Sequence, residues 1–144
     1  MKKEELIEKI KSEGNLQIFV HRGYICVVMR PYWIGCCPGF EDHPALIHLC
    51  GYVGVPEGHP FYGKKYDDDK LLGAPAHGGL TFSGPSIAGS HRSGLWWFGF
   101  DAAHFGDLHS LHPTANGGVY RSMEYMTRQT KKLAEWLRRR EALK

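Results

Sequence analysis

The chain has 144 residues, of which 42% are hydrophobic and 12% aromatic, enough apolar material for one core and too little chain for two independent domains. Its net charge of +3 is small, and no stretch approaches the ~20 consecutive apolar residues that span a bilayer. We therefore expect one domain over residues 1–144. Because the first residues are charged where a secretory signal is apolar, we also expect the protein to stay in the cytoplasm.

The excess of positive charge gathers near the carboxyl end, at Lys131, Lys132, Arg138, Arg139 and Arg140. A basic helix end that faces solvent also complements the helix dipole, so this run is a weak argument for nucleic acid. We therefore do not expect a polynucleotide partner.

Four cysteines, Cys26, Cys36, Cys37 and Cys50, lack the CxxC spacing of zinc-binding or redox motifs. The adjacent Cys36 and Cys37 are also poorly placed for an ordinary disulfide. Since cytosolic proteins keep their thiols reduced, we expect reduced and mostly buried cysteines.

The first predicted element is a short amphipathic helix over residues 2–13. Leu6, Ile7 and Ile10 fall on one stripe of it, and Gly14 ends the pattern.

Strands are predicted in the middle of the chain. Residues 24–30 are rich in β-branched side chains, and residues 46–55 alternate between an apolar and a mixed face. The most hydrophobic run, residues 95–101, predicts a central strand. Between them, residues 56–93 are rich in Gly, Pro and His and are interrupted by a strand-like segment at 79–83. A long irregular stretch in a small domain is usually functional or mobile.

The last element, residues 119–144, predicts a long amphipathic helix. Its apolar residues fall close to a 3.6-residue stripe: Val119, Met123, Met126, Leu133 and Leu137. Strands with few intervening helices, and a helix at each end, indicate an α+β fold with a mostly antiparallel sheet.

Several blocks occur in a fixed order: GYVGVPEGHP at 51–60, HGGLT at 77–81, WWFGFDxAHxGD at 96–107, and Tyr120-Arg121 with Glu124-Tyr125. In these blocks the chain resembles a family of small proteins common in tailed bacteriophage genomes. The resemblance covers about residues 46 to 137 and implies a phage origin, so the mechanism has to be argued from the residues themselves.

Two histidines in the irregular region are candidate catalytic residues. His59 lies in Gly58-His59-Pro60 and His77 lies in His77-Gly78-Gly79, and such backbone freedom lets a loop approach a ligand closely. Imidazoles titrate near neutral pH, so two of them can act as general base and general acid without a metal. The alternative is that both side chains only satisfy loop carbonyl groups.

Asp101 and His104 are further catalytic candidates at the exit of the predicted central strand. They are three residues apart, on one face if the chain turns helically, and Asp107 continues that face. A carboxylate beside an imidazole fixes its tautomer and raises its basicity. No cofactor is favoured, but His77, Asp101, His104 and Asp107 could instead hold a divalent metal ion. The spacing alone does not decide between the two.

Aromatic and cationic side chains near these histidines suit a nucleotide, because aromatic faces stack bases and cations hold phosphates. Trp96 and Trp97 are neighbours in a predicted strand, so at least one of them belongs to the core. Other cations near the loops are Lys65 and Arg92. The candidate ligand-binding residues are Tyr62, Lys64, Tyr66, Thr81, Trp97 and Arg121.

Together these features lead to a functional hypothesis. We expect a phage counter-defence protein that binds a small or cyclic nucleotide signal and cleaves it as a histidine-based phosphodiesterase. Two alternatives stay open: a non-catalytic protein that sequesters the nucleotide, and an inhibitor that binds a host defence enzyme. The expected partner is a small nucleotide and not a membrane, and self-association into a homo-oligomer is left open.

Overall fold

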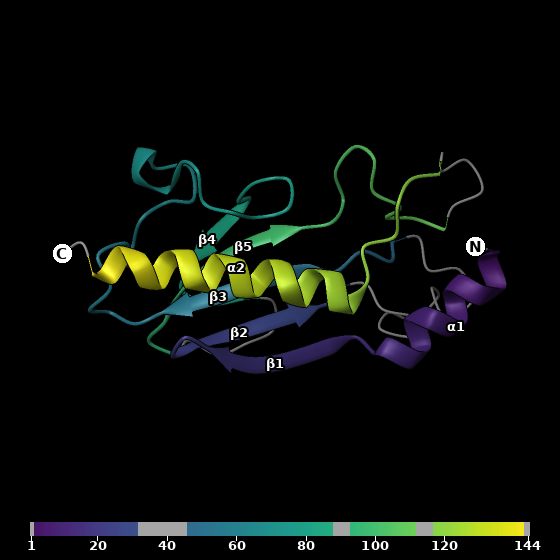
Figure 1. Cartoon of the computed structure of the whole chain (residues 1–144), viewed down its shortest axis with the longest axis horizontal. Coiled ribbons are helices and arrows are strands. Elements are labelled where there is room, and N and C mark those ends of the chain that lie inside the picture. Colours follow the sequence, from purple (N-terminus) through teal and green to yellow (C-terminus); the bar gives the residue numbers. More distant parts are fainter. Residues whose placement is uncertain (1, 32–45, 88–92, 112–116, 143–144) are drawn as a thin grey trace.

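A five-stranded antiparallel sheet, in the order β1-β2-β3-β5-β4, forms the centre of the computed structural model. The structure describes residues 2–31, 46–87, 93–111 and 117–142. A short helix α1 lies beside one end of the sheet, and a long helix α2 crosses one face (Figure 1). The elements are α1 (Lys3–Glu13), β1 (Leu16–His21), β2 (Tyr24–Met29), β3 (Cys50–Val55), the 3-10 turn η1 (Asp69–Leu71), β4 (Phe82–Gly84), β5 (Trp96–Asp101) and α2 (Met123–Glu141).

The predicted α+β fold with a mostly antiparallel sheet, a short first helix and a long last helix is confirmed. β1 was not predicted from the sequence; it pairs with β2 through a two-residue turn. Arg22 and Gly23 in this turn have φ values of 53° and 84°. Positive φ at both central residues gives the turn the twist that an antiparallel hairpin requires.

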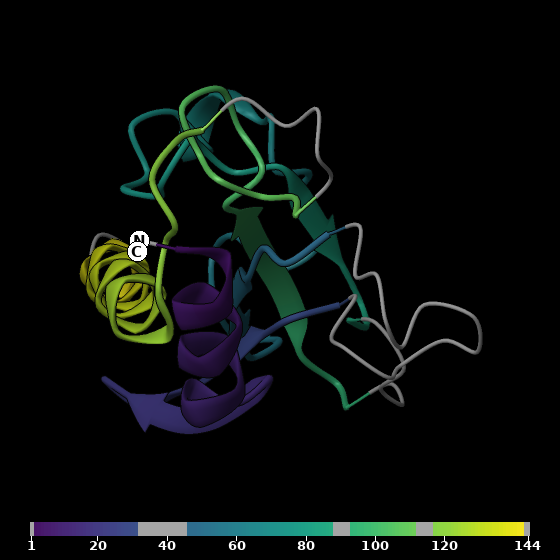
Figure 2. The same ribbon diagram turned by 90° about the vertical axis from the view of Figure 1, so that its right-hand side faces the viewer.

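Helix α2 lies along one face of the sheet, as Figure 2 shows, and buries its apolar stripe against that face. The helix comes close to the sheet at Gly51 in β3, where a Cβ would lie 2.5 Å from Thr130 Oγ1 and 2.6 Å from the Phe100 ring. A larger residue at Gly51 would therefore push the helix off the sheet. The shared core contains Cys26, Val28, Val53, Phe98, Phe100, Met126, Leu133, Ala134 and Leu137.

Helix α2 begins four residues later than the predicted segment. Ser122 is its N-cap, and its hydroxyl accepts a hydrogen bond from the backbone N–H of Tyr125 at 3.2 Å. The basic residues of the last turn lie near the carboxyl end of the helix, where they complement its dipole. In the part of the chain that the structure describes, neither helix has the length and apolar character needed to cross a membrane.

Arg30, immediately after β2, is 1% exposed although it carries a charge. A guanidinium has five N–H donors, and each of them has an acceptor here. The acceptors lie at the end of α1 and just after it, in the segment before β3 and in the segment before α2. The acceptors are Asn15 Oδ1, the Ile47 carbonyl, Tyr120 Oη, Glu13 Oε2 and the Gly14 carbonyl.

The substitution Arg30→Lys is expected to lower the free energy of unfolding by about 3 kcal/mol, because a lysine cannot supply the planar fork and leaves several of the buried acceptors around Arg30 without a donor. Urea denaturation measures the loss. Arg128→Lys is the matched control, since the Arg128 side chain is 60% exposed and pairs only with the exposed Glu124 among the described residues, so its loss should stay below ~0.5 kcal/mol. Equal stability of the two variants would contradict this view of Arg30.

Candidate functional site

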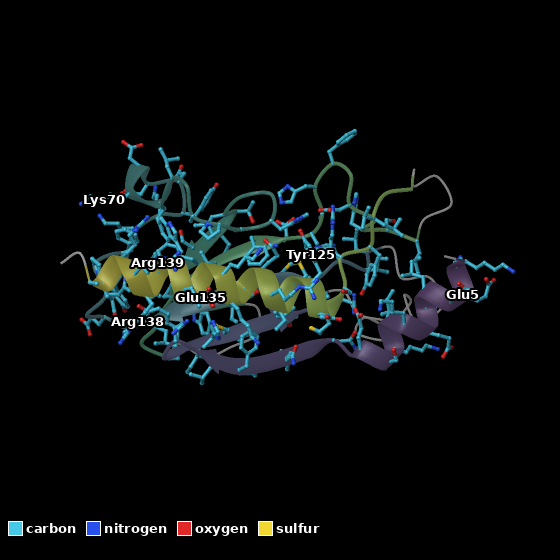
Figure 3. The ribbon with its side chains drawn as sticks, viewed as in Figure 1. Glu5, Lys70, Tyr125, Glu135, Arg138 and Arg139 are labelled. Carbon is cyan, nitrogen blue, oxygen red and sulfur yellow. The ribbon has the colours of Figure 1, made fainter. Side chains whose placement is uncertain are left out.

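Three segments meet beside the end of β5. They are the loop before β4, the turn that follows β5, and the segment that leads into α2 (Figure 1). Tyr125, labelled in Figure 3, belongs to the first turn of α2 and reaches this meeting point. The side chains that gather here are His77, Asp101, His104, Asp107, Arg121 and Tyr125, which we call the histidine cluster.

The carboxylate of Asp107 is the centre of the histidine cluster. It is buried and accepts hydrogen bonds from His77 Nε2 at 2.8 and 2.9 Å, Arg121 Nε at 2.9 Å and the backbone N–H of His104 at 3.1 Å. A parallel bridge between Asp107 and Val119 holds the two chain segments together. Burial by itself would raise the pKa of Asp107, but these hydrogen bonds outweigh it and hold the pKa below its ordinary value.

His77 lies between a carboxylate and a phenol. Its Nε2 bonds Asp107, and its Nδ1 lies 2.8 Å from the hydroxyl of Tyr125. Since an ionised carboxylate only accepts, Nε2 carries a proton and a neutral His77 accepts the Tyr125 O–H at Nδ1. Although His77 lies in a glycine-rich loop, its side chain is only 12% exposed. Both ring nitrogens of His77 are therefore bonded within the cluster, to Asp107 and to Tyr125.

His104 is the more accessible imidazole, with 32% of its side chain exposed. Its ring centroid lies 6.1 Å from that of His77, and its Nε2 lies 3.3 Å from Asp101 Oδ1. That approach is an ion-pair distance without the alignment of a hydrogen bond, and Nε2 has no hydrogen-bond partner among the described residues. Nε2 itself is buried, so a ligand would reach His104 at the exposed part of its ring.

The carboxylate of Asp101 and the ring of His104 are both held in place by the loop before β4. Thr81 donates its hydroxyl to Asp101 Oδ2 at 3.0 Å, and the backbone N–H of Ala103 donates to Oδ1 at 3.0 Å. The backbone of Gly78 packs on the His104 ring, and a Cβ there would collide with it. With φ at 72°, position 78 requires glycine for its conformation as well.

His59 lies outside the histidine cluster. It is 3% exposed, its Nε2 donates to the Leu137 carbonyl at 2.9 Å, and its Nδ1 accepts from the backbone N–H of Phe61 at 2.9 Å. Leu137 follows Tyr125 by twelve residues on α2, a separation of about 18 Å at ~1.5 Å per residue. The pairing of His59 with His77 is therefore replaced by a pairing of His104 with His77, and His59 supports the fold.

The ligand-binding candidates divide into two groups. Arg121 belongs to the histidine cluster and Thr81 bonds Asp101 in it, while the other four lie elsewhere. Tyr62 packs against Trp96 with ring centroids 6.0 Å apart, and the indole N–H of Trp96 donates to the Lys64 carbonyl. The backbone N–H of Tyr66 donates to Ser83 Oγ.

Trp97 is a core residue. It is 5% exposed and packs with Val27 and Ile87 on the face of the sheet away from α2, because successive residues of a strand point to opposite faces. Cys26 and Cys50 are free and buried as expected, whereas Cys36, Cys37 and Arg92 lie outside the described residues.

Tyr125 and His109 were not predicted from the sequence as site residues. Tyr125 stands in the last of the quoted blocks, but its contact with His77 joins positions 48 residues apart. His109 Nδ1 lies 3.1 Å from the Asp107 carbonyl. A hollow of about 310 Å³ on this turn is lined by His104, His109 and the fully exposed Phe105, among others.

The metal alternative named His77, Asp101, His104 and Asp107. Within the ranges that the structure describes, no group of three or more His, Cys, Asp or Glu side chains is arranged to hold a metal ion. The carboxylate of Asp107 and both nitrogens of His77 already have partners, so a metal bound there would have to displace Arg121 or Tyr125.

Comparisons of the chain with known protein families, with curated proteins and with solved structures find no match. The resemblance to a phage family therefore stays a prediction, and the geometry of the histidine cluster has to carry the functional argument.

The substitution Asp107→Asn tests the centre of the cluster through its pH dependence. A carboxyl group whose pKa is lower in the folded than in the unfolded state stabilises the fold at pH values above its ordinary pKa, here 3.8. This stabilisation is lost as the pH falls through the pKa of the folded state. At neutral pH the variant should lose about 3 kcal/mol, since Arg121 is left without its carboxylate.

The difference in unfolding free energy between wild type and Asp107→Asn should shrink below about pH 4, which urea titrations at several pH values would show. Glu124→Gln, at a side chain that is 82% exposed, is the control and should be nearly neutral. A difference that does not change with pH would contradict a lowered pKa of Asp107.

Proposed function

We propose that the protein is a phage counter-defence phosphodiesterase that acts in the host cytoplasm on a small or cyclic nucleotide. The observation that supports this proposal is the pairing of two imidazoles, His77 and His104, whose ring centroids lie 6.1 Å apart and each of which lies beside a carboxylate. Two imidazoles at this distance can act on one phosphodiester group, one as the general base and the other on the side of the general acid.

In this proposal His104 is the base. It is the more exposed of the two imidazoles, and Asp101 lies 3.3 Å from its ring nitrogen to stabilise the charge that it gains. His104 takes the proton of a 2′-hydroxyl group at Nδ1, since its Nε2 is buried beside Asp101. The bond from the 2′-oxygen to phosphorus then forms as the bond from phosphorus to the leaving oxygen breaks.

The leaving oxygen receives its proton from Tyr125. Tyr125 is restored by a protonated His77, whose Nδ1 lies 2.8 Å from the phenol oxygen and whose other nitrogen faces Asp107. Arg121 stacks 5.0 Å from the centre of the Tyr125 ring and places positive charge where charge develops on phosphorus. Water then opens the cyclic phosphate product with the two roles reversed.

A second candidate is a protein that sequesters the nucleotide without cleaving it. The observation that favours it is the saturation of the inner cluster, since Asp107 and both nitrogens of His77 have partners already. Such a network holds side chains rigidly, which serves binding as well as catalysis. Incubation with cyclic nucleotides, followed by heating and mass spectrometry of what is released, separates cleavage products from intact ligand.

The substitution His104→Ala should reduce the rate of nucleotide cleavage by ~10²- to 10⁴-fold and change the melting temperature little, because the side chain is partly exposed. Cleavage is followed by chromatography of the nucleotide products. His59→Ala is the matched control: it should lower the melting temperature, because His59 is buried and bonded, and keep its rate per folded molecule. The proposal fails if His104→Ala cleaves at the wild-type rate.

Metal dependence provides a separate test. Under the proposed mechanism activity survives exhaustive chelation and has a bell-shaped pH profile, since one imidazole must be neutral and the other protonated. Loss of activity with chelator and its return with Mn²⁺ or Zn²⁺ would show that an ion activates water or neutralises the phosphate instead.

A further inference from the structure

Strand β1 carries a row of exposed aliphatic side chains. Leu16, Ile18 and Val20 are 59%, 64% and 68% exposed, and Ile25, which is paired with Val20 in β2, is 42% exposed. These four residues form what we call the β1 face. The intervening residues of β1 point to the other side, where Gln17 bonds Thr127 and His21 bonds Glu135 of α2. The β1 face therefore lies on the side of the sheet that α2 leaves uncovered.

The backbone of β1 is also open along one edge. β1 stands at the margin of the sheet (Figure 1) and pairs only with β2 among the described strands. In an antiparallel ladder every second residue turns its N–H and C=O away from its neighbour, so the margin keeps unused donors and acceptors. Natural edge strands usually avoid association by being short or by carrying Lys or Pro.

The two margins of this sheet differ in that respect. β4, at the opposite margin, has three residues, and its Ser83 hydroxyl already accepts the backbone N–H of Tyr66. β1 has six residues, LQIFVH, with neither Lys nor Pro among them. β4 is thus protected by its short length, whereas β1 is neither short nor marked by Lys or Pro.

We propose that β1 pairs antiparallel with β1 of a second copy of this chain, about a twofold axis, and joins the two sheets into one. The second copy is the partner that fits, since the same strand offers both the open edge and the aliphatic row, and a twofold contact joins identical surfaces. This proposal does not depend on the proposed function.

Pairing of the two edges places the β1 faces of the two copies next to each other on one side of the joined sheet. Each face exposes roughly 400 Å² of aliphatic side chain, the size of the largest apolar patch that a monomer ordinarily shows. Across the new strand pair, contacts between aliphatic side chains stabilise the dimer in addition to the backbone hydrogen bonds. The histidine cluster is at the β5 side of the sheet, so both clusters stay open in the dimer.

Light scattering after gel filtration, over a series of concentrations of the full chain, tests the proposal. The wild type should show a mass of twice 16.3 kDa that falls toward 16.3 kDa on dilution. Ile18→Lys should raise the dissociation constant of the dimer at least ~100-fold, because it brings like charges together across the axis. Leu72→Lys, at an aliphatic side chain that is 70% exposed on another part of the molecule, is the matched control and should dimerise as the wild type does.

Amide hydrogen exchange on the wild type keeps the test independent of how well the variants fold. Backbone amides of β1 should exchange more slowly as the protein concentration rises, and amides of β4 should not change. A mass of 16.3 kDa at every concentration, with β1 exchange that does not depend on concentration, overturns the proposal. A dimer that Ile18→Lys leaves intact overturns it as well, since that dimer would use another surface.

Discussion

The buried guanidinium of Arg30 is the interaction on which the rest of this structure depends. It ties the end of α1 to the approach of β3 and, through Tyr120 and Glu13, to the start of α2, where Glu13 also accepts the backbone N–H of Met123. A buried charge is tolerated only where every donor finds an acceptor. Because Tyr120 directly precedes Arg121, the position of Arg30 also fixes where the last segment enters the histidine cluster.

Asp107 connects the chain segments of the histidine cluster, as Arg30 connects the elements of the fold. One carboxylate sets the turn after β5 through the His104 backbone, the loop before β4 through His77, and the approach to α2 through Arg121. The central groups of the two networks have opposite charges, and the networks are joined directly through the adjacent residues Tyr120 and Arg121. The geometry proposed for proton transfer is therefore set by buried ionic groups that do not themselves face a ligand.

Hydrophobic periodicity was sufficient to predict both helices and the strands β2, β3 and β5. It did not lead to β1, although Leu16, Ile18 and Val20 alternate with residues that face α2. In the candidate site, residue type selected His77, Asp101, His104 and Asp107, which the structure brings together.

Residue type could not distinguish His59 from His77, because both lie in glycine- and proline-rich loops. The two histidines differ in the groups that bond to their ring nitrogens. His59 bonds Leu137, 78 residues away, and His77 bonds Tyr125, 48 residues away. The local pattern holds no information on contacts of that length. The same limit applies to Arg30, whose bond to Tyr120 spans 90 residues.

These long separations have a consequence for how the protein is made. The bond between Tyr120 and Glu13 joins positions 107 residues apart, and the contacts of His77 with Asp107 and Tyr125 span 30 and 48. Contacts of high sequence separation form late, since the loops they close must lose their entropy first. During synthesis the hairpin of β1 and β2 can pair as soon as it leaves the ribosome. The cluster stays unassembled until α2 has emerged and docked, so a chain arrested before that point carries the histidines without their arrangement.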